Sequence, residues 1–227
     1  NTIFLNNHCV FYEEKGDNME TKKVPKNARK PNLYYLSIED VNKIIDAAKN
    51  LRDRLILKIL ARTGIRRFEL CNLKVQDVDF QYKKLDMVTT KGGVPRSVPL
   101  DDDTLQEIKF YIGSRQYGKL IQSNRKNIDG IDESRINEIV RKTAEKAGVK
   151  NPDPKKKHLN PHIFRHSYVR HLIKQGYPQS YIQQFAGHTD IGTTIAMYGR
   201  TGFSDMQDKF NDIAHTFYKK HQPKQDE

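Results

Sequence analysis

Residues 160–172 read NPHIFRHSYVRHL, and residues 184–198 read QFAGHTDIGTTIAMY. Asn160 followed by Pro161 is typical of a helix start, because Asn caps the first N–H groups and Pro fits the first helical position. His162 and Arg165 are three residues apart, so both side chains are expected on one face near the positive end of this helix. Such a place is suited to holding a phosphate.

The residues that follow predict two more short helices. Gly176 should end the first helix, and Pro178 should begin the second, which Gly187 ends in turn. His188 is then expected at an exposed helix end, and a third helix carries Tyr198. Three consecutive helices therefore deliver two histidines, an arginine and a tyrosine, none of which is needed there for burial.

This constellation resembles the tyrosine recombinase (lambda-integrase-like) family, with His162-x-x-Arg165, Gly187-His188 and Tyr198 in the family's order. Each residue alone has an ordinary explanation. A His-x-x-Arg pair on a helix is usually a surface pair, and a tyrosine at a helix end is usually a half-buried aromatic. The joint pattern is much rarer by chance, and the rest of the chain tests it.

A second motif lies upstream, where residues 63–74 read TGIRRFELCNLK. It is similar to the family's T-G-x-R-x-x-E-L box, and the resemblance makes Arg66 the first catalytic arginine and Glu69 its supporting acid. Glu69 is one helical turn after Arg66, so it can accept N–H groups of Arg66 and fix the guanidinium plane. Arg67 stands where the family usually has an apolar residue. The alternative is a pair of solvated arginines at a helix start.

Residues 85–100, LDMVTTKGGVPRSVPL, predict two short strands around a Lys-Gly-Gly turn. The run K-G-x-x-x-R-x-V-P-L puts Lys91 where the family has a hairpin lysine that reaches the scissile phosphate. Without its neighbours Lys91 would be taken as an ordinary solvated lysine. Arg96 of the same run is predicted to bind DNA.

The stretch 150–158, KNPDPKKKH, is a basic loop that leads into the helix of His162. Its lysines Lys155, Lys156 and Lys157 are predicted to contact DNA phosphates without sequence preference. An ordinary solubilising loop is an equally good interpretation of this stretch.

The composition restricts the class of protein. A net charge of +12 and a pI near 9.5 indicate a polyanionic partner or a solubility device. Lys and Arg recur along the whole chain, which favours nucleic acid. No apolar run approaches membrane-spanning length and no secretory segment is recognisable, so no membrane association is expected. Cys9 and Cys71 make neither a zinc site nor a disulfide framework, and we expect a cytoplasmic protein that acts where the DNA is.

Three parts are predicted along the chain. Residues 1–15 have roughly helical apolar spacing ended by Gly16, and a polar, basic linker follows. By the resemblance, 1–31 is the truncated end of an N-terminal DNA-clamping domain plus linker, since the chain opens on Asn rather than Met. Residues 32–202 are the expected catalytic domain. Residues 203–227 predict an amphipathic helix and tail, docked on a neighbouring protomer or folded back on its own domain.

The expected fold class is α+β and mainly helical, with a small β-hairpin on one side of the catalytic domain. Helices are predicted from Ser37 to Ala48, over 51–63, over 101–112 and from Ser134 to Ala147. The helix over 51–63 is apolar on most sides, which places it at the centre, and Gly64 should end it.

The resemblance implies a site-specific DNA recombinase or integrase that cleaves and rejoins strands through a covalent 3′-phosphotyrosine, without a metal ion or other cofactor. Tyr198 is the expected nucleophile, and Arg66 and Arg165 hold the non-bridging phosphate oxygens. Lys91 is the candidate general acid. His162 assists Tyr198 or the proton traffic, and His188 hydrogen-bonds a phosphate oxygen. The implied partners are double-stranded DNA and further copies of the chain, as a tetramer on paired sites.

Two other functions remain open at this point. A tyrosine-type topoisomerase would use similar groups but relax supercoils without a partner site, and a DNA-binding module of the same fold would lack the chemistry. The intact Tyr198, Arg66 and Arg165 argue against the module. The predicted C-terminal helix suits an assembly of protomers and argues against the topoisomerase.

Overall fold

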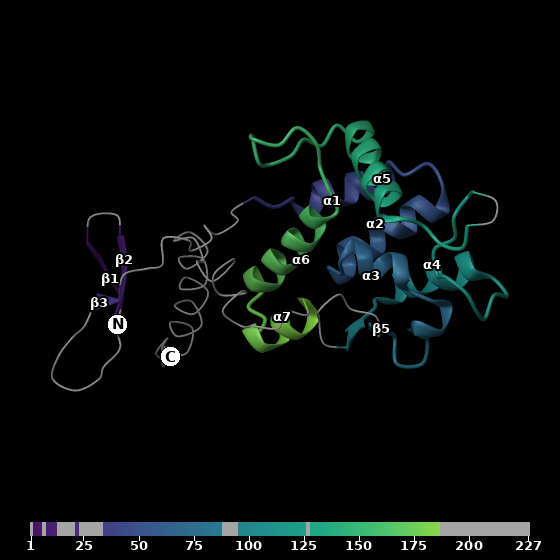
Figure 1. Ribbon diagram of the computed structural model, residues 1–227, viewed down its shortest axis with the longest axis horizontal. Helices are drawn as coiled ribbons and strands as arrows, with labels where there is room; N and C mark the ends of the chain where they lie inside the picture. Colours follow the sequence, from purple (N-terminus) through teal and green to yellow (C-terminus); the bar gives the residue numbers. More distant parts are fainter. Residues whose placement is uncertain are drawn as a thin grey trace, which may run out of the picture.

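The computed structural model describes Thr2–Leu5, His8–Tyr12, Thr21–Lys22 and residues 34–87, 95–125 and 128–186. In these ranges the helices are α1 (Ile38–Asp46), α2 (Leu51–Thr63), α3 (Arg67–Asn72), the 3-10 helix η1 (Val75–Asp77), α4 (Asp102–Ile112), α5 (Glu133–Lys146), α6 (His162–Lys174) and α7 (Gln179–Ala186). Together with two small antiparallel sheets they confirm the predicted α+β, mainly helical class (Figure 1).

The first sheet overturns the helix predicted over residues 1–15. Its strands are β1 (Thr2–Leu5), β2 (His8–Tyr12) and β3 (Thr21–Lys22), with Ile3 opposite Val10 and Leu5 opposite His8. Most of the apolar residues here are β-branched or aromatic, namely Ile3, Phe4, Val10, Phe11 and Tyr12, which favours strands. Two asparagines separate the paired Leu5 and His8, and Asn-rich two-residue connections are typical of hairpins.

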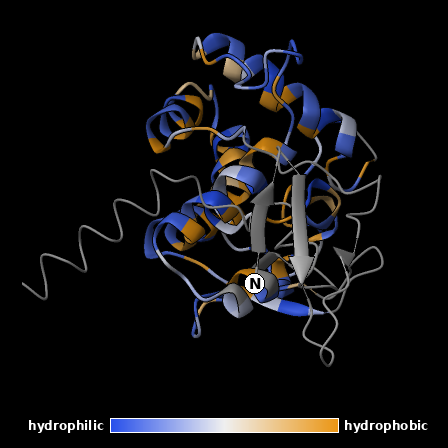
Figure 2. Ribbon diagram, turned by 90° about the vertical axis from the view of Figure 1, so that its left-hand side faces the viewer, coloured by the Kyte–Doolittle hydropathy of each residue, from blue (hydrophilic) through white to orange (hydrophobic). Residues whose placement is uncertain are grey.

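Helix α2 is the centre of the fold, as its apolar sequence predicts. Five of its aliphatic side chains have no exposed surface, namely Leu55, Ile56, Leu57, Ile59 and Leu60. The helix contacts α1, α3, α4, α5 and α6, and hydrophobic residues of the helices gather between them (Figure 2). Asn50 caps its start by accepting the N–H of Asp53 at 2.9 Å, and Gly64 ends it with φ +61°. The described elements that carry Arg66 and Arg165 are thus fixed to one buried helix.

The second sheet confirms the predicted hairpin. It joins β4 (Val78–Asp79), β5 (Lys84–Met87) and β6 (Arg96–Pro99), with Leu85 opposite Val98 and Met87 opposite Arg96. Val78, Leu85 and Val98 are buried, so one face of the sheet packs on the core. Arg96 stands at the end of the β5–β6 pair from which the sequence continues to Lys91. Strand β4 was not predicted.

Helix α6 begins one residue later than predicted. Pro161 is the capping residue, and the Asn160 side chain still accepts the N–H of His162 at 3.0 Å. Gly176, with φ +82°, follows its end, and the Pro178 carbonyl accepts N–H groups of the first turn of α7, so both predicted breaks are confirmed.

The same helix holds the segment that leads into α1. Ser167 Oγ accepts the N–H of Leu36 at 2.8 Å, and His171 Nε2 lies 3.0 Å from the Leu36 carbonyl oxygen. The guanidinium of Arg170 and the ammonium of Lys174 both lie over the ring of Tyr35. Residues 35 and 36 are therefore attached directly to α6.

Candidate active site

Arg165 reaches the backbone next to the other predicted catalytic arginine, Arg66. Its guanidinium is buried, with 5% of the residue exposed, and Nη1 donates to the Gly64 carbonyl at 2.8 Å. Gly64 lies two residues before Arg66, although it is 101 positions from Arg165. The packing of α6 on α2 therefore brings Arg165 to the start of α3, where Arg66 stands.

Glycine is required at position 64 for two reasons. Its φ of +61° is left-handed, and a Cβ there would lie 2.5 Å from Cδ1 of Tyr168. Burial raises the pKa of this Tyr168 to about 12, so its ring fills the space as a neutral group. The close approach of the α2 end to α6 is what places the Gly64 carbonyl within reach of Arg165.

Glu69 orients Arg66 as predicted. Its Oε2 accepts the backbone N–H of Arg66 at 2.7 Å, and its Oε1 accepts from Nη1 of Arg66 at 3.1 Å. The Glu69 side chain is only 1% exposed. Burial acts to raise the pKa of Glu69, but hydrogen bonds from Arg96 and from the Arg66 backbone outweigh it and hold that pKa below its usual value. Glu69 is therefore a buried anion at the base of Arg66.

Arg96, for which a DNA contact is predicted, lies buried against Glu69 in the structure. Both of its terminal nitrogens donate to Glu69, at 2.8 and 2.9 Å, and its side chain is 5% exposed. A buried guanidinium needs a counterion, and Glu69 supplies it. Arg96 belongs to the support of the site rather than to its surface.

Two histidines occupy the first turns of α6. His162 is exposed, and its ring centroid lies 6.3 Å from that of His166. Desolvation, and then the charges of Arg165, Arg67 and Arg66, lower the pKa of His162. Burial, with nearby positive charge, lowers the pKa of His166 to about 4. Both imidazoles are therefore neutral at pH 7, and His162 is able to accept a proton.

The lysine loop lies beside this helix start. Lys155, Lys156 and Lys157 are exposed, as expected for phosphate contacts. Lys156 lines a hollow of about 310 Å³ together with His162 and His166, and its Nζ lies 3.5 Å from an oxygen of Asp153. The loop thus adds positive charge next to His162.

Arg67 has a contact that sequence reasoning missed. Its Nε lies 2.5 Å from Glu133 and its Nη1 donates to Asn137 at 3.1 Å, which ties the start of α3 to α5. The only signal in the sequence was a charged residue where the resembled family has an apolar one.

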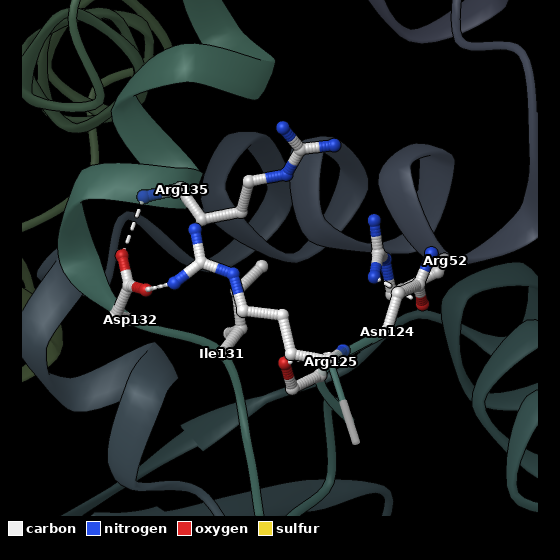
Figure 3. Close-up of a pocket in the computed structure, with 7 residues that line it drawn as sticks. Arg52, Asn124, Arg125, Ile131, Asp132 and Arg135 are labelled. Atoms are coloured by element: carbon white, nitrogen blue, oxygen red, sulfur yellow. Dashed lines mark hydrogen bonds and ion pairs between the residues drawn. The ribbon is translucent and has the colours of Figure 1, made fainter. Parts of the chain in front are cut away.

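A second basic hollow was also missed. It has a volume of about 210 Å³ and is lined by Arg52, Arg125 and Arg135 from three separate parts of the chain (Figure 3). Arg52 donates to Asn124 at 2.5 Å, and Asp132, the capping residue of α5, accepts the N–H of Arg135 at 2.7 Å. No motif marks these arginines, because their convergence depends on the tertiary fold.

The structure thus brings Arg66, Glu69, Arg165 and His162 to one end of α2 and α6. The predictions for Lys91, His188 and Tyr198 fall outside the residues that it describes. Within the described ranges no group of three His, Cys, Asp or Glu side chains is placed to hold a metal ion. No helix in those ranges is both long and apolar enough to span a membrane.

The phage integrase family model matches residues 34–204 of this chain. The chain belongs to the phage integrase family. The match begins where the continuous described part begins and includes each motif that carried the resemblance to the tyrosine recombinases.

Individual relatives agree with this family. The tyrosine recombinase XerA of Pyrococcus furiosus is 33% identical over 186 residues, which cover 80% of this chain and 61% of the relative. The tyrosine recombinase XerC of Staphylococcus aureus is 37% identical over 161 residues, 66% of this chain and 49% of the relative. The chain therefore spans about three fifths or less of the length of these relatives.

Solved structures show the same fold. The crystal structure of XerA recombinase superposes with a TM-score of 0.65 at 28% identity and covers 89% of this chain and 68% of that one. A pre-cleavage complex of the XerH site-specific recombinase with its difH substrate superposes with a TM-score of 0.62 at 20% identity. The match covers 80% of this chain and 55% of that one. At that lower identity the likeness is one of fold, which is that of a tyrosine recombinase catalytic domain.

Proposed function

We propose that this chain is the catalytic part of a site-specific DNA recombinase that breaks and rejoins strands through a 3′-phosphotyrosine on Tyr198. The observation that carries the proposal is that Arg165 binds the Gly64 carbonyl, two residues before Arg66, and that both arginines lie close enough to His162 to lower its pKa. Two neighbouring guanidinium groups suit the two non-bridging oxygens of a phosphodiester. Membership of the phage integrase family and the names of the relatives support the same reaction class.

In the cleavage step, the Tyr198 oxygen attacks phosphorus, and the bond from phosphorus to the 5′-oxygen breaks. Negative charge grows on the non-bridging oxygens, where Arg66, Arg165 and His188 donate hydrogen bonds. Lys91 gives a proton to the departing 5′-oxygen, and the tyrosine proton leaves through His162. The products are a phosphotyrosine ester and a 5′-hydroxyl, and the reverse step reseals the strand.

The electrostatics described above fit this division of roles. Because its pKa is lowered, His162 is neutral at pH 7 and can accept the proton of Tyr198. Glu69 stays charged at this pH, since its pKa is also lowered, and it keeps the Arg66 fork in one orientation. No step of the scheme requires a metal ion, and cleavage is expected to continue in EDTA.

We further propose that the partner is double-stranded DNA and that four copies act on two paired sites. Lys155, Lys156 and Lys157 meet the backbone near His162, and Arg125 and Arg135 line a separate basic hollow. The division into 1–31, 32–202 and 203–227 remains part of this proposal, with residues 1–31 adding to the grip on DNA.

The test is covalent trapping on a nicked duplex. A binding site is first selected from a pool of random duplexes with the 227-residue chain, and a nick beside the cleaved phosphate lets the released fragment diffuse away. The parent should form a protein–DNA adduct, and Tyr198→Phe should bind equally well and form none. Tyr181→Phe, at an exposed tyrosine of α7, is the matched control and should still form the adduct. An adduct with Tyr198→Phe would contradict the assignment.

Two assays on the same protein distinguish a recombinase from a topoisomerase. A recombinase should exchange strands only when two selected sites are present. Relaxation of a supercoiled plasmid without such sites, at a rate similar to that of exchange, would favour the topoisomerase instead.

A further inference from the structure

Arg96 is the buried charge that the proposed chemistry leaves without a role. It shares both oxygens of Glu69 with Arg66. Oε1 accepts from Arg96 Nη1 at 2.8 Å and from Arg66 Nη1 at 3.1 Å. Oε2 accepts from Arg96 Nη2 at 2.9 Å and from the Arg66 backbone N–H at 2.7 Å. One buried carboxylate thus links two arginines.

The geometry of this link is restrictive. Two parallel N–H bonds from one guanidinium fix the plane of a carboxylate as well as its position. Held in that plane by Arg96, Glu69 can meet both the side chain and the backbone of Arg66. With Arg96 removed, the carboxylate is able to rotate about its last side-chain bond, and the orientation of Arg66 is less defined.

The position of Arg96 in the sheet adds a second consequence. It is the first residue of β6 and pairs with Met87, at the end of the β5–β6 pair from which the sequence continues to residues 88–94. Its bond to Glu69 therefore fastens this end of the β5–β6 pair to the first turn of α3. The element that leads to Lys91 and the element that carries Arg66 are joined by this ion pair.

We propose that Arg96 is a positioning residue, which acts through Glu69 to orient Arg66 and to hold the β5–β6 pair against the start of α3. This inference rests on the proposed recombinase function and deepens it. A DNA contact is the alternative role, and a purely structural ion pair is the other. Each of the three has a different signature in binding, cleavage and stability.

The experiment compares Arg96→Gln and Arg96→Lys with the parent on the nicked duplex, under single-turnover conditions and at saturating protein. We expect Arg96→Gln to bind with unchanged affinity and salt dependence and to cleave about tenfold to a hundredfold more slowly. Arg96→Lys keeps the positive charge but loses the two parallel N–H bonds of the guanidinium. It should therefore cleave faster than Arg96→Gln but more slowly than the parent. Glu69→Gln combined with Arg96→Gln should be no slower than Glu69→Gln alone, because the two act in series.

The pH profile gives a readout that a structural role would not move. Within the described part of the chain, the charged groups that hold Glu69 ionised are Arg66 from the start of α3 and Arg96 from β6. Without Arg96 the carboxyl group takes up a proton at higher pH. The acid limb of cleavage by Arg96→Gln should therefore lie at higher pH than that of the parent, while Arg96→Lys should shift it less.

Two controls define the alternatives. Lys155→Gln removes an expected phosphate contact, so it should weaken binding and reduce the salt slope by about one unit. Arg54→Gln breaks the arginine–glutamate pair with Glu107 on the far part of α2 and should leave binding and cleavage as in the parent. If Arg96→Gln behaves like Lys155→Gln, the residue is a DNA contact and the inference is wrong. A lower melting temperature with an unchanged saturating rate and acid limb also overturns it.

An NMR measurement on the protein without DNA tests the role of Arg96 even if the proposed function is wrong. If the parent forms no adduct, the recombinase assignment fails, but the orientation of Arg66 can still be followed. The Nε–H signal of Arg66 in an NMR spectrum, assigned with Arg66→Lys, should be sharp in the parent and broadened or shifted in Arg96→Gln. An unchanged signal contradicts the positioning role even then.

Discussion

At the scale of single residues, the proposed reaction assigns buried groups to stabilising charge and exposed groups to holding DNA. Arg165 is almost fully buried and is fixed to the Gly64 carbonyl, whereas Lys155, Lys156 and Lys157 are exposed. A buried, oriented donor acts on charge that develops in the transition state. An exposed lysine mainly exchanges with counterions along the backbone.

Replacement of either proposed catalytic arginine should therefore affect cleavage much more than binding. Arg66→Ala and Arg165→Ala are each expected to slow single-turnover cleavage by about a hundredfold or more, because each removes a transition-state donor. Substitution of the three lysines by Gln should instead lower affinity at all DNA sequences and flatten the salt dependence. Equal losses of binding and cleavage in all five positions would contradict this division.

His166 should make the folded state sensitive to acid. Burial, His162, Arg165 and Lys156 lower its pKa from 6.5 to about 4, so in this range the unfolded chain binds a proton that the folded chain does not. Its contribution to stability is complete above pH 6.5 and is lost as the pH falls toward 4. After allowance for partial exposure, the loss is on the order of 1 kcal/mol.

Urea unfolding at pH 7 and near pH 4.5 checks this effect. His166→Gln should lose less stability between the two pH values than the parent. An equal loss in both proteins would show that the acid sensitivity arises elsewhere.

At the scale of elements, the site depends on how the end of α2 meets α6. The glycine at this end has a close neighbour in Tyr168. Gly148 also has a positive φ, of +70°, but no atom lies within 4 Å of the position that a Cβ would occupy there. A substitution at Gly148 therefore tests backbone strain alone, whereas one at Gly64 tests strain together with crowding against Tyr168.

Gly64→Ala should cost more than Gly148→Ala. The strain of a left-handed alanine is about 1 kcal/mol at either position, and at position 64 the displacement of Tyr168 adds to it, for a total above about 2 kcal/mol. Because the Gly64 carbonyl would move away from Arg165, cleavage should also fall. Thermal unfolding and trapping measure both effects, and equal unfolding losses for the two variants would argue against the crowding.

The elements that follow local rules were predicted from the sequence, and the contacts between them were not. Helix α2 and the β5–β6 hairpin were correct because an all-round apolar helix and a Gly-containing turn between strand patterns are local signals. Residues 1–15 were wrong because a short apolar run fits both helical and strand periods, and the strand-forming residue types decided it.

The candidate site shows the same limit. The pairing of Glu69 with Arg66 was predictable, since three residues separate them in one helical turn. Its pairing with Arg96, 27 residues away, and that of Arg165 with Gly64, 101 residues away, depend on how the sheet and α6 pack on the core. A spacing rule carries no information about such distances, so Arg96 was placed on the DNA surface instead.

At the scale of the whole molecule, assembly remains the main prediction. Residues 203–217 have apolar residues at helical spacing, but they lie outside the described part of the chain. We expect them to dock on a neighbouring protomer, with the Gly199–Gly202 segment as the hinge, or else to fold back as part of their own core.

Truncation after Thr201 distinguishes these arrangements. If the segment acts between protomers, the shortened chain should keep its melting temperature within about 2 °C and lose cooperative recombination on paired sites, which reads out assembly. A fall of about 10 °C or more would mean that the segment belongs to the core of its own chain.

Leu36 has its N–H and its carbonyl both engaged by α6, through Ser167 and His171. That helix begins at His162 and carries Arg165, so tension on the chain ahead of residue 34 reaches the catalytic helix before it reaches α1. The two bonds at Leu36 and the contacts of Tyr35 with Arg170 and Lys174 would bear that load first. Mechanical force on the upstream chain and the placement of Arg165 are thus coupled through residues 35 and 36.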